Sequence, residues 1–511
     1  MRSDRRAYLV QRLLVVAGML GRLLAIFGIV LALPAVVGLV YGEVRMALSF
    51  FACGALTAAG GWALQRYVPR GRLGVREAVL LCTGAWAICS LLAAVPLYLT
   101  SRLGGLDSIF ECVSGLTTTG LTVLNGLEGY SRTVLFWRSL SQLLGGLGIL
   151  SFFLLVSYPG SAAHRVLQTE STAVHVPRPT PSLHRTVMIT WMIYGIFLVA
   201  NLVVLLILGV GVFDAVNYAC TTTSTGGFAP RDLGVGYFAA VGHPNAYAIE
   251  LATVVFMLLG GVNYLRHYRA MTGNVGVLFT GTEPRRYWML LLAALALVMV
   301  ESLTMPGNWS ALSGPDAGGL MGQSIGWQSF RVASFQVASL VSSAGHLTVP
   351  LEHPFFGSAA RQLFLCLLLL GGCAGSTAGG LKIVRAAVLG KSLVQEIRKL
   401  SHPEGTVLPV VLDRRVVQTR TVQSMAAMAF AWIVLMMLGG LLLALDSSHG
   451  PLQCLSLSVS ALSNVGPSFL PMQEIAHLPA LSKVLLMVWM IAGRLEILPV
   501  LALFSARTWH Q

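Results

Sequence analysis

Four short segments that end in glycine are the residues of this sequence best suited to holding a cation. They occupy 117–120, 223–226, 342–345 and 463–466, and each begins with threonine or serine. A cation that loses its hydration shell needs several oxygens in its place, and rings of backbone carbonyls supply them. Glycine helps because its backbone reaches φ values that are closed to other residues. The repetition therefore predicts one ion filter that is lined by four loops of a single chain.

The expected ligands are the backbone carbonyls of the last three residues of each segment, with hydroxyl groups adding oxygen or bracing the loops. These residues are Thr118, Thr119, Gly120, Ser224, Thr225, Gly226, Ser343, Ala344, Gly345, Asn464, Val465 and Gly466. Because the four segments differ, the field of the filter should be asymmetric. The third segment is followed by His346, which either faces the outer mouth, where its charge could change near neutral pH, or packs beside the loop.

A charged residue, Arg494, lies inside an apolar run near the end of the chain. A charge within a membrane is costly and is a functional candidate. It could sit in the permeation path below the filter as an electrostatic barrier or gate. Alternatively, it is a structural arginine that binds backbone carbonyls or reaches the membrane interface. Glu496 is only two residues away, so on a helix the two side chains point in different directions.

A glycine-rich stretch at 371–380 interrupts another apolar run. Five glycines in ten residues should break a helix there. A flexible loop beneath the filter would suit a gate that is formed by Gly372, Gly375, Ser376, Thr377, Gly379 and Gly380. The alternative is close helix packing through Gly375 and Gly379, which have the spacing of a GxxxG contact. The phosphate-loop pattern GxxxxGK[ST] is not matched.

Composition sets the elements that must position these residues. Apolar residues make up 55% of the 511 residues and charged residues 11%, far below the roughly 25% that is usual in soluble proteins. Most of the 34 lysines and arginines lie in the gaps on one side of the apolar runs, which predicts a cytoplasmic N-terminus and argues against nucleic-acid binding. No arrangement of catalytic residues stands out, and the histidines do not form a metal set. The chain is therefore not expected to be an enzyme or to hold an organic cofactor.

The apolar runs repeat as a long helix, a short segment that ends in the glycine loop, and another long helix. The short segments are about 12–13 residues long and cannot span a bilayer, which suits re-entrant helices that line a wet cavity. We expect an all-α polytopic membrane protein with about ten transmembrane helices and four re-entrant pore helices, as four pseudo-symmetric repeats around one pore. The expected parts are an N-terminal helix pair at 1–70 and repeats at 71–160, 161–270, 271–400 and 401–511.

The motifs resemble those of the Trk/Ktr/HKT superfamily of potassium transporters, and in particular the bacterial Trk-type pore subunit. The relevant stretches are SGLTTTG at 114–120, STGGF at 224–228, GGCAGSTAGG at 371–380, SNVGP at 463–467 and AGRLEI at 492–497. The resemblance implies that Gly120, Gly226, Gly345 and Gly466 line a K⁺ filter, and that Arg494 and the loop near 372–380 restrict flow.

The same resemblance implies K⁺ as the transported ion, a homodimer in the bacterial cytoplasmic membrane, and gating by a nucleotide-binding regulatory subunit of the RCK/KTN type. The third segment departs from the threonine-rich pattern, which puts ion discrimination and pH response in question. The alternative is a Na⁺-permeable or Na⁺/H⁺-coupled transporter of the same superfamily. The filter glycine of the first segment, Gly120, argues against this alternative, because a serine at that position would favour Na⁺ permeation.

Overall fold

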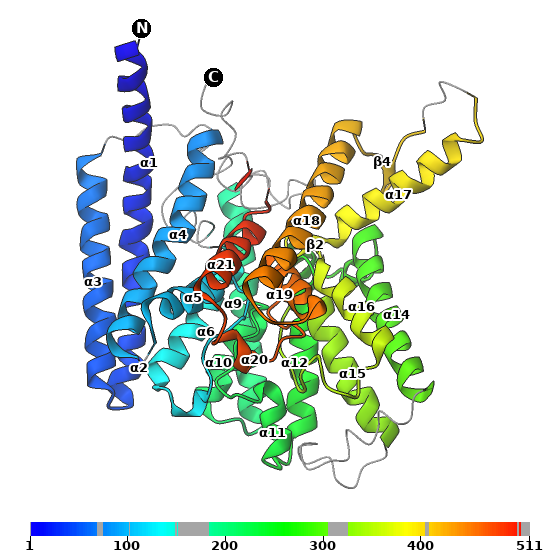
Figure 1. The fold of residues 1–511 in the computed structure, drawn as a ribbon, viewed down its shortest axis with the longest axis horizontal. Helices are drawn as coiled ribbons and strands as arrows, with labels where there is room; N and C mark the ends of the chain where they lie inside the picture. The colour runs from blue at the N-terminus through cyan, green and yellow to red at the C-terminus, as the bar shows by residue number, and fades with distance from the viewer. Residues whose placement is uncertain are drawn as a thin grey trace.

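The structure is a computed structural model of the 511-residue chain, and Figure 1 shows its helical architecture. It describes residues 2–68, 75–101, 103–148, 151, 183–304, 325–403, 408–497 and 500–501. The beginning of the expected repeat at 161–270 lies outside these residues up to 182, as does the end of the expected repeat at 401–511 beyond 501.

The N-terminal segment forms a pair of candidate membrane spans beside the rest of the molecule (Figure 1). The first span is formed by α1 (Arg2–Leu31) and the short α2 (Pro34–Val40), and the second is α3 (Val44–Tyr67). Glycines allow α1 and α3 to pack closely, because a Cβ added to Gly54 of α3 would lie 2.6 Å from the carbonyl oxygen of Gly28 in α1. Residues 2–68 are all described, and no re-entrant segment lies between α1 and α3.

Each of the four repeats has a first helix, a short pore helix and a second helix. The first helices are α4 (Val75–Thr100), α9 (Leu183–Ile207), α14 (Thr282–Thr304) and α18 (Thr419–Asp446). The pore helices are α5 (Gly105–Leu116), α10 (Val212–Thr223), α15 (Ile325–Val341) and α19 (Pro451–Ser463). The second helices are α6 (Arg132–Gly146), α12 (Ala246–Gly260), α16 (Ser358–Leu369) and α21 (Ala480–Arg494).

Short elements connect the repeats. The helical ones are η1 (Leu127–Gly129), η2 (Gly234–Gly236), α11 (Tyr237–Ala240), α13 (Tyr264–Met271), η3 (Val275–Leu278), α17 (Ile383–Lys399) and α20 (Met472–Ile475). Strand β1 (Leu370–Gly371) pairs in parallel with β2 (Leu381–Lys382), and β3 (Val411–Leu412) pairs antiparallel with β4 (Arg415–Val416). Helix α17 and the β3–β4 hairpin project from the body (Figure 1).

The all-α polytopic fold is confirmed, but the ten expected spans are not equally continuous. Within the described residues, six helices are long and apolar enough to cross a membrane, or seven if α12 and α13 count as one bent span. The remaining spans are the second helices of the repeats, which end early. Each of these helices ends at a glycine or within two residues of one.

Acidic side chains fix where three of the second helices begin. Glu43 accepts the N–H groups of Arg132 and Thr133 at the start of α6. Glu301 does the same at the start of α16, and Asp446 accepts the Ser482 N–H in the first turn of α21. A carboxylate is favourable there because the first N–H groups of a helix have no partner within it.

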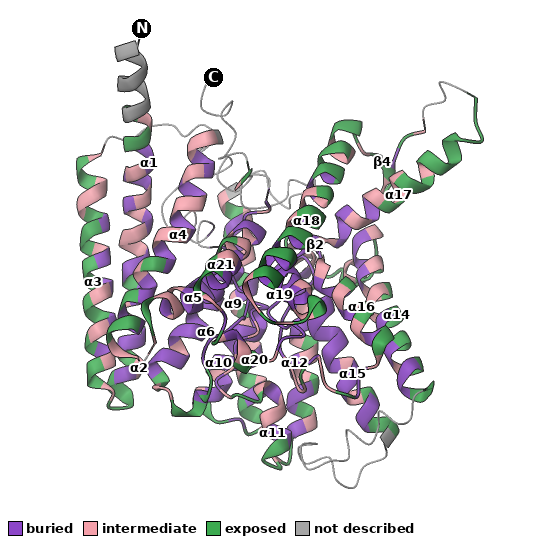
Figure 2. Ribbon diagram, viewed as in Figure 1, coloured by how far each residue is buried: buried purple, intermediate pink, exposed green. Residues whose placement is uncertain are grey.

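The pore helices lie at the centre, where buried residues gather (Figure 2). Their many small and hydroxyl residues permit this, because a hydroxyl can donate to a carbonyl one turn earlier, as Thr221 does to Asn217 at 3.1 Å. An aspartate at a helix start is a usual N-cap candidate, but Gly104 and Gly211 hold the N-cap positions of α5 and α10, ahead of Asp107 and Asp214. The two aspartates lie in the first turn and form ion pairs instead.

Candidate cation filter and the loop beneath it

The chain leaves each pore helix through the same backbone turn. Thr118, Thr225, Ser343 and Asn464 all adopt left-handed φ angles, of 54°, 51°, 55° and 52°. Each donates its N–H to the carbonyl three residues earlier, and the next residue donates to the carbonyl five residues before it. Non-glycine residues seldom adopt this region, so four occurrences at equivalent places show that the loops share one geometry.

A glycine with positive φ follows two residues after each left-handed residue. The φ angles are 85° at Gly120, 85° at Gly227, 74° at Gly345 and 101° at Gly466. The register predicted for the second loop is therefore wrong by one residue: Gly227, not Gly226, is equivalent to the other three glycines. Ser224 correspondingly matches Thr117, so the equivalent trio in this loop is Thr225, Gly226 and Gly227.

The four glycines bring the loops together as a closed ring, here called the filter ring. A Cβ added to each glycine would meet, at 3.0 Å or less, the carbonyl oxygen that precedes the equivalent glycine of the next loop. Gly120 meets Gly226, Gly227 meets Ala344, Gly345 meets Val465 and Gly466 meets Thr119. Because the fourth contact returns to the first loop, the loops surround one axis in chain order. Any side chain at these positions would collide with a neighbouring carbonyl.

The electrostatics of this ring suit a cation. All four pore helices end immediately before their loops, so their C-terminal ends, which carry partial negative charge, converge on the ring. Side chains tie adjacent loops together: the Asn464 amide donates to the Thr119 hydroxyl at 2.9 Å, and that hydroxyl also contacts the Thr117 hydroxyl at 2.8 Å. Here the hydroxyl groups brace the loops.

The glycine-rich stretch forms an irregular loop, here called the intramembrane loop (372–380). As expected, the helix breaks there, between α16 and α17. Gly375 and Gly379 are not helical, which rules out the helix-packing alternative. The Thr377 hydroxyl accepts a hydrogen bond from Thr225 at 3.1 Å, and a Cβ on Gly379 would meet Ser463 and Asn464. The loop therefore lies directly against the filter ring.

The break between α12 and α13 anchors this loop. The two helices bend by 104° there, and Gly261 accepts the Cys373 N–H at 2.9 Å. The Tyr264 N–H donates to Gly375 at 3.1 Å, and the Asn263 amide donates to Ala374. Glu283, in the first turn of α14, accepts the Ala374 N–H at 2.6 Å. Two broken helices from adjacent repeats thus hold each other.

Arg494 links the filter ring to the intramembrane loop. Its guanidinium donates to the Thr118 hydroxyl at 3.2 Å and to the Thr377 carbonyl at 3.3 Å. It also donates to the carbonyls of Gly145 and Gly146 at the end of α6. The side chain thus binds backbone carbonyls, as the structural alternative expects, and its position between the first loop and the intramembrane loop leaves the gating role a prediction. Glu496 pairs with Arg385.

A family model for cation transport proteins, TrkH, matches residues 45–511. The chain belongs to the TrkH family. The match covers nearly all of the chain, including all four loops, so this TrkH-family chain is a multi-pass membrane transport protein rather than an enzyme.

Individual relatives agree along almost the full length. The Trk system potassium uptake protein TrkH of Halomonas elongata is 28% identical over 98% of this chain and 100% of its own length. An uncharacterized cation transporter of Methanocaldococcus jannaschii is 27% identical over 92% of this chain and 90% of its own. The crystal structure of the potassium transporter TrkH from Vibrio parahaemolyticus superimposes with a TM-score of 0.82, at 26% identity, over 97% of this chain and 99% of that one.

His346 is packed inside this TrkH-family chain and does not face an open mouth. Its side chain is 1% exposed, and its Nε2 lies 3.3 Å from the Thr222 hydroxyl of α10. The ring also lies 6.2 Å from that of Tyr218, between centroids. The departure in the third loop thus contributes a contact between the second and third repeats.

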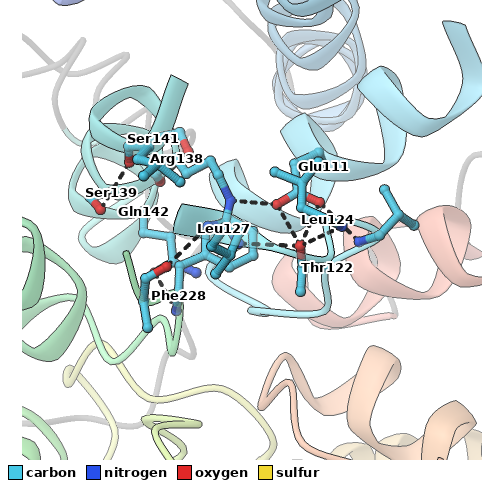
Figure 3. Close-up of polar contacts among 12 residues, drawn as sticks. Glu111, Thr122, Leu124, Leu127, Arg138, Ser139, Ser141, Gln142 and Phe228 are labelled. Atoms are coloured by element: carbon cyan, nitrogen blue, oxygen red, sulfur yellow. Dashed lines mark hydrogen bonds and ion pairs between the residues drawn. The ribbon is translucent and has the colours of Figure 1, made fainter. Parts of the chain in front are cut away.

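Sequence reasoning missed a buried ion pair behind the first loop (Figure 3). Arg138 of α6 and Glu111 of α5 are 2% and 1% exposed, and their Nε and Oε1 atoms are 2.6 Å apart. Thr122, in the chain leaving the first loop, donates to both Glu111 oxygens. Arg138 also donates to Ala229, after the second loop, at 3.1 Å. The available signal was one charged residue, Glu111, in the short apolar segment of the first repeat and another, Arg138, in the long apolar run that follows it.

Proposed function

We propose that this chain takes up K⁺ across the bacterial cytoplasmic membrane through a gated, channel-like pore. The observation that carries the proposal is the closed ring of four glycine loops at the ends of four pore helices. The carbonyls of the equivalent trios would replace the water shell of the ion. For the second loop these are Thr225, Gly226 and Gly227, one residue later than the sequence alone indicates. The names of the relatives support K⁺ as the ion.

Flow through the filter ring would be restricted by Arg494 and the intramembrane loop. Both touch residues of the ring from the same side, and Arg494 places a positive charge in the path of a cation. In this proposal the closed state has the loop bonded to Gly261, Tyr264 and Glu283, as found here. Opening would require those bonds to break while the filter ring stays intact.

Two copies of the chain are proposed to assemble as a homodimer, with the N-terminus of each in the cytoplasm. Each copy would consist of five parts, at 1–70, 71–160, 161–270, 271–400 and 401–511. The projecting α17 and β3–β4 hairpin carry the basic residues Lys391, Arg398, Lys399, Arg414 and Arg415. With this orientation they face the cytoplasm, where a nucleotide-binding regulatory subunit could dock through complementary charge.

The deciding experiment is transport by the purified chain in liposomes, with and without the regulatory partner. Radiolabelled rubidium entry driven by an imposed gradient, inhibited by K⁺ more strongly than by Na⁺, is the expected result. Growth of cells that lack K⁺ uptake should also be rescued at low K⁺. Equal or greater Na⁺ entry would favour the alternative of a Na⁺-permeable transporter, and dependence on a pH or Na⁺ gradient would show coupling.

A further inference from the structure

The second loop of the filter ring lacks a side chain that the other three possess. At the position between the left-handed residue and the ring glycine, the first, third and fourth loops have Thr119, Ala344 and Val465. The second loop has Gly226 there. Without a Cβ, its backbone is less restricted and leaves space behind the loop. Something else must therefore fix this quarter of the ring.

The side chain that occupies the space is Gln142 of α6, which belongs to the first repeat. It is fully buried, its Nε2 donates to the Gly226 carbonyl at 2.6 Å, and its Oε1 accepts the Phe228 N–H at 3.1 Å. Gly227 lies between these two bonded residues. A Cβ added to Gly226 would meet all three terminal heavy atoms of Gln142 at 2.9 Å or less. The amide and a side chain at 226 therefore exclude each other.

A second contact from the same helix supports this arrangement (Figure 3). Arg138 lies one turn before Gln142, and its guanidinium donates to the Ala229 carbonyl and lies 4.1 Å from the centre of the Phe228 ring. Since residues four apart share a helix face, α6 presents both side chains to the chain leaving the second loop. The ion pair with Glu111 fixes Arg138 in turn.

We infer that Gln142 is a positioning residue of the filter, which sets the geometry of the second loop and so contributes to discrimination between K⁺ and Na⁺. This inference rests on the proposed function for its ion readout. Gln142 takes the structural place of the missing side chain at 226 and adds two hydrogen bonds that only an amide with both a donor and an acceptor can make. The second loop is thus held by the neighbouring repeat.

The test is a cycle of Gln142→Ala, Gly226→Ala and the double variant, with rubidium and sodium entry measured separately in liposomes. Gln142→Ala should lower the rubidium-to-sodium ratio by roughly two- to tenfold, the effect of losing a net hydrogen bond. Gly226→Ala should lower it too, because the methyl group displaces the amide. The double variant should recover part of the loss, since the methyl group can then fill the vacated space as Ala344 does.

Ser139→Ala is the matched control, because Ser139 is a buried residue of α6 whose hydroxyl, among the described residues, bonds only to the Leu135 carbonyl of its own helix. It should leave the ratio unchanged. Melting temperatures of the wild type, the two single variants of the cycle and the double variant give a readout that does not depend on transport. Gly226→Ala should lower the melting temperature more when Gln142 is present than when it is alanine.

The outcomes separate this inference from the proposed function. If the wild type prefers Na⁺ or carries no cation, the proposed function fails, while coupling in the melting temperatures still decides whether Gln142 holds the loop. The inference would be overturned if the effects of the two substitutions were additive in both measurements, or if both single variants kept the rubidium-to-sodium ratio of the wild type. A loss of ratio in Gln142→Ala that the double variant does not recover would also do so, because it would reduce Gln142 to ordinary packing.

Discussion

Replacing Arg494 with alanine tests whether this side chain closes the pore or only stabilises the fold. Among the four oxygens to which Arg494 donates in the described part of the chain, the Thr377 carbonyl is the one that belongs to the intramembrane loop, at 3.3 Å. A hydrogen bond from a charged donor contributes about 1.5–3 kcal/mol. The distance is at the long end of the usual range, so we take about 1.5 kcal/mol. That free energy corresponds to roughly a tenfold shift toward an open loop.

The size of the effect follows from what remains in the variant. The loop keeps its bonds to Gly261, Tyr264 and Glu283, so Arg494→Ala should raise basal conductance about tenfold and should not open the pore fully. The positive charge is also lost from the path of the cation, which acts in the same direction. The assay is single-channel recording or rubidium entry in liposomes, in the absence of any regulatory partner.

A second variant keeps this prediction testable if Arg494→Ala folds poorly. Glu283→Gln weakens the bond to the Ala374 N–H and leaves unchanged the four residues to which Arg494 donates in the described structure, and it should raise basal flux in the same direction. Unchanged flux in both variants, with melting temperatures close to the wild type, would refute the closing role. A fall in melting temperature without a rise in flux from the folded fraction would instead mean that Arg494 is structural.

Three further predictions concern the loops and their supports. Gly120→Ser should reduce rubidium-over-sodium selectivity, because its Cβ would meet the Gly226 carbonyl; Gly129→Ser, where a Cβ meets nothing within 4 Å, is the control, and equal flux ratios in both would contradict a filter role. Glu111→Ala leaves Arg138 charged and buried, so the free energy of unfolding should fall by about 3–5 kcal/mol in denaturation of detergent-solubilised protein, and a loss below about 1 kcal/mol would be inconsistent with a buried pair. Burial and a neighbouring glutamate, Glu128, raise the pKa of Asp232, which lies between the second loop and η2, so the contribution of Asp232 to stability is largest at low pH and is lost as pH rises through that pKa. Asp232→Asn can still accept the Leu127 N–H, and its melting temperature should rise relative to that of the wild type as pH increases from about 4; a constant difference would be evidence against the raised pKa.

The repeated architecture could be predicted because its signals are local. Apolar runs, short re-entrant segments and the glycine-rich stretch at 371–380 each report their own structure. The register of the second loop could not be predicted, because the segments 223–226 and 224–227 both begin with a hydroxyl residue and end in glycine. Only the backbone separates them, through the left-handed φ of Thr225 and the positive φ of Gly227.

The contacts between repeats escaped prediction for a different reason. Arg138 and Gln142 lie in an ordinary-looking second helix, and their partners in the second loop are more than 80 positions away in the chain. The breaks of α6, α12 and α21 were also missed, because one or two glycines do not by themselves end a helix. What the sequence does not reveal is how closely the pore helices pack against these glycines: a Cβ on Gly145 or Gly493 would collide with the carbonyl of Leu116 or Leu462.

The filter ring combines a common backbone with different supports, and this bears on how its selectivity can be judged. The four ring glycines meet equivalent carbonyls, so the loops themselves impose near-symmetry. Behind them, Asn464 braces the first loop through Thr119, Gln142 braces the second, and His346 joins the third to α10. A change in a tetrad need not alter the ring if its support changes with it, as Gly226 and Gln142 illustrate. Selectivity should therefore follow the pair of loop and support, and a departure such as Ala344 can be judged only together with the residues that pack behind it.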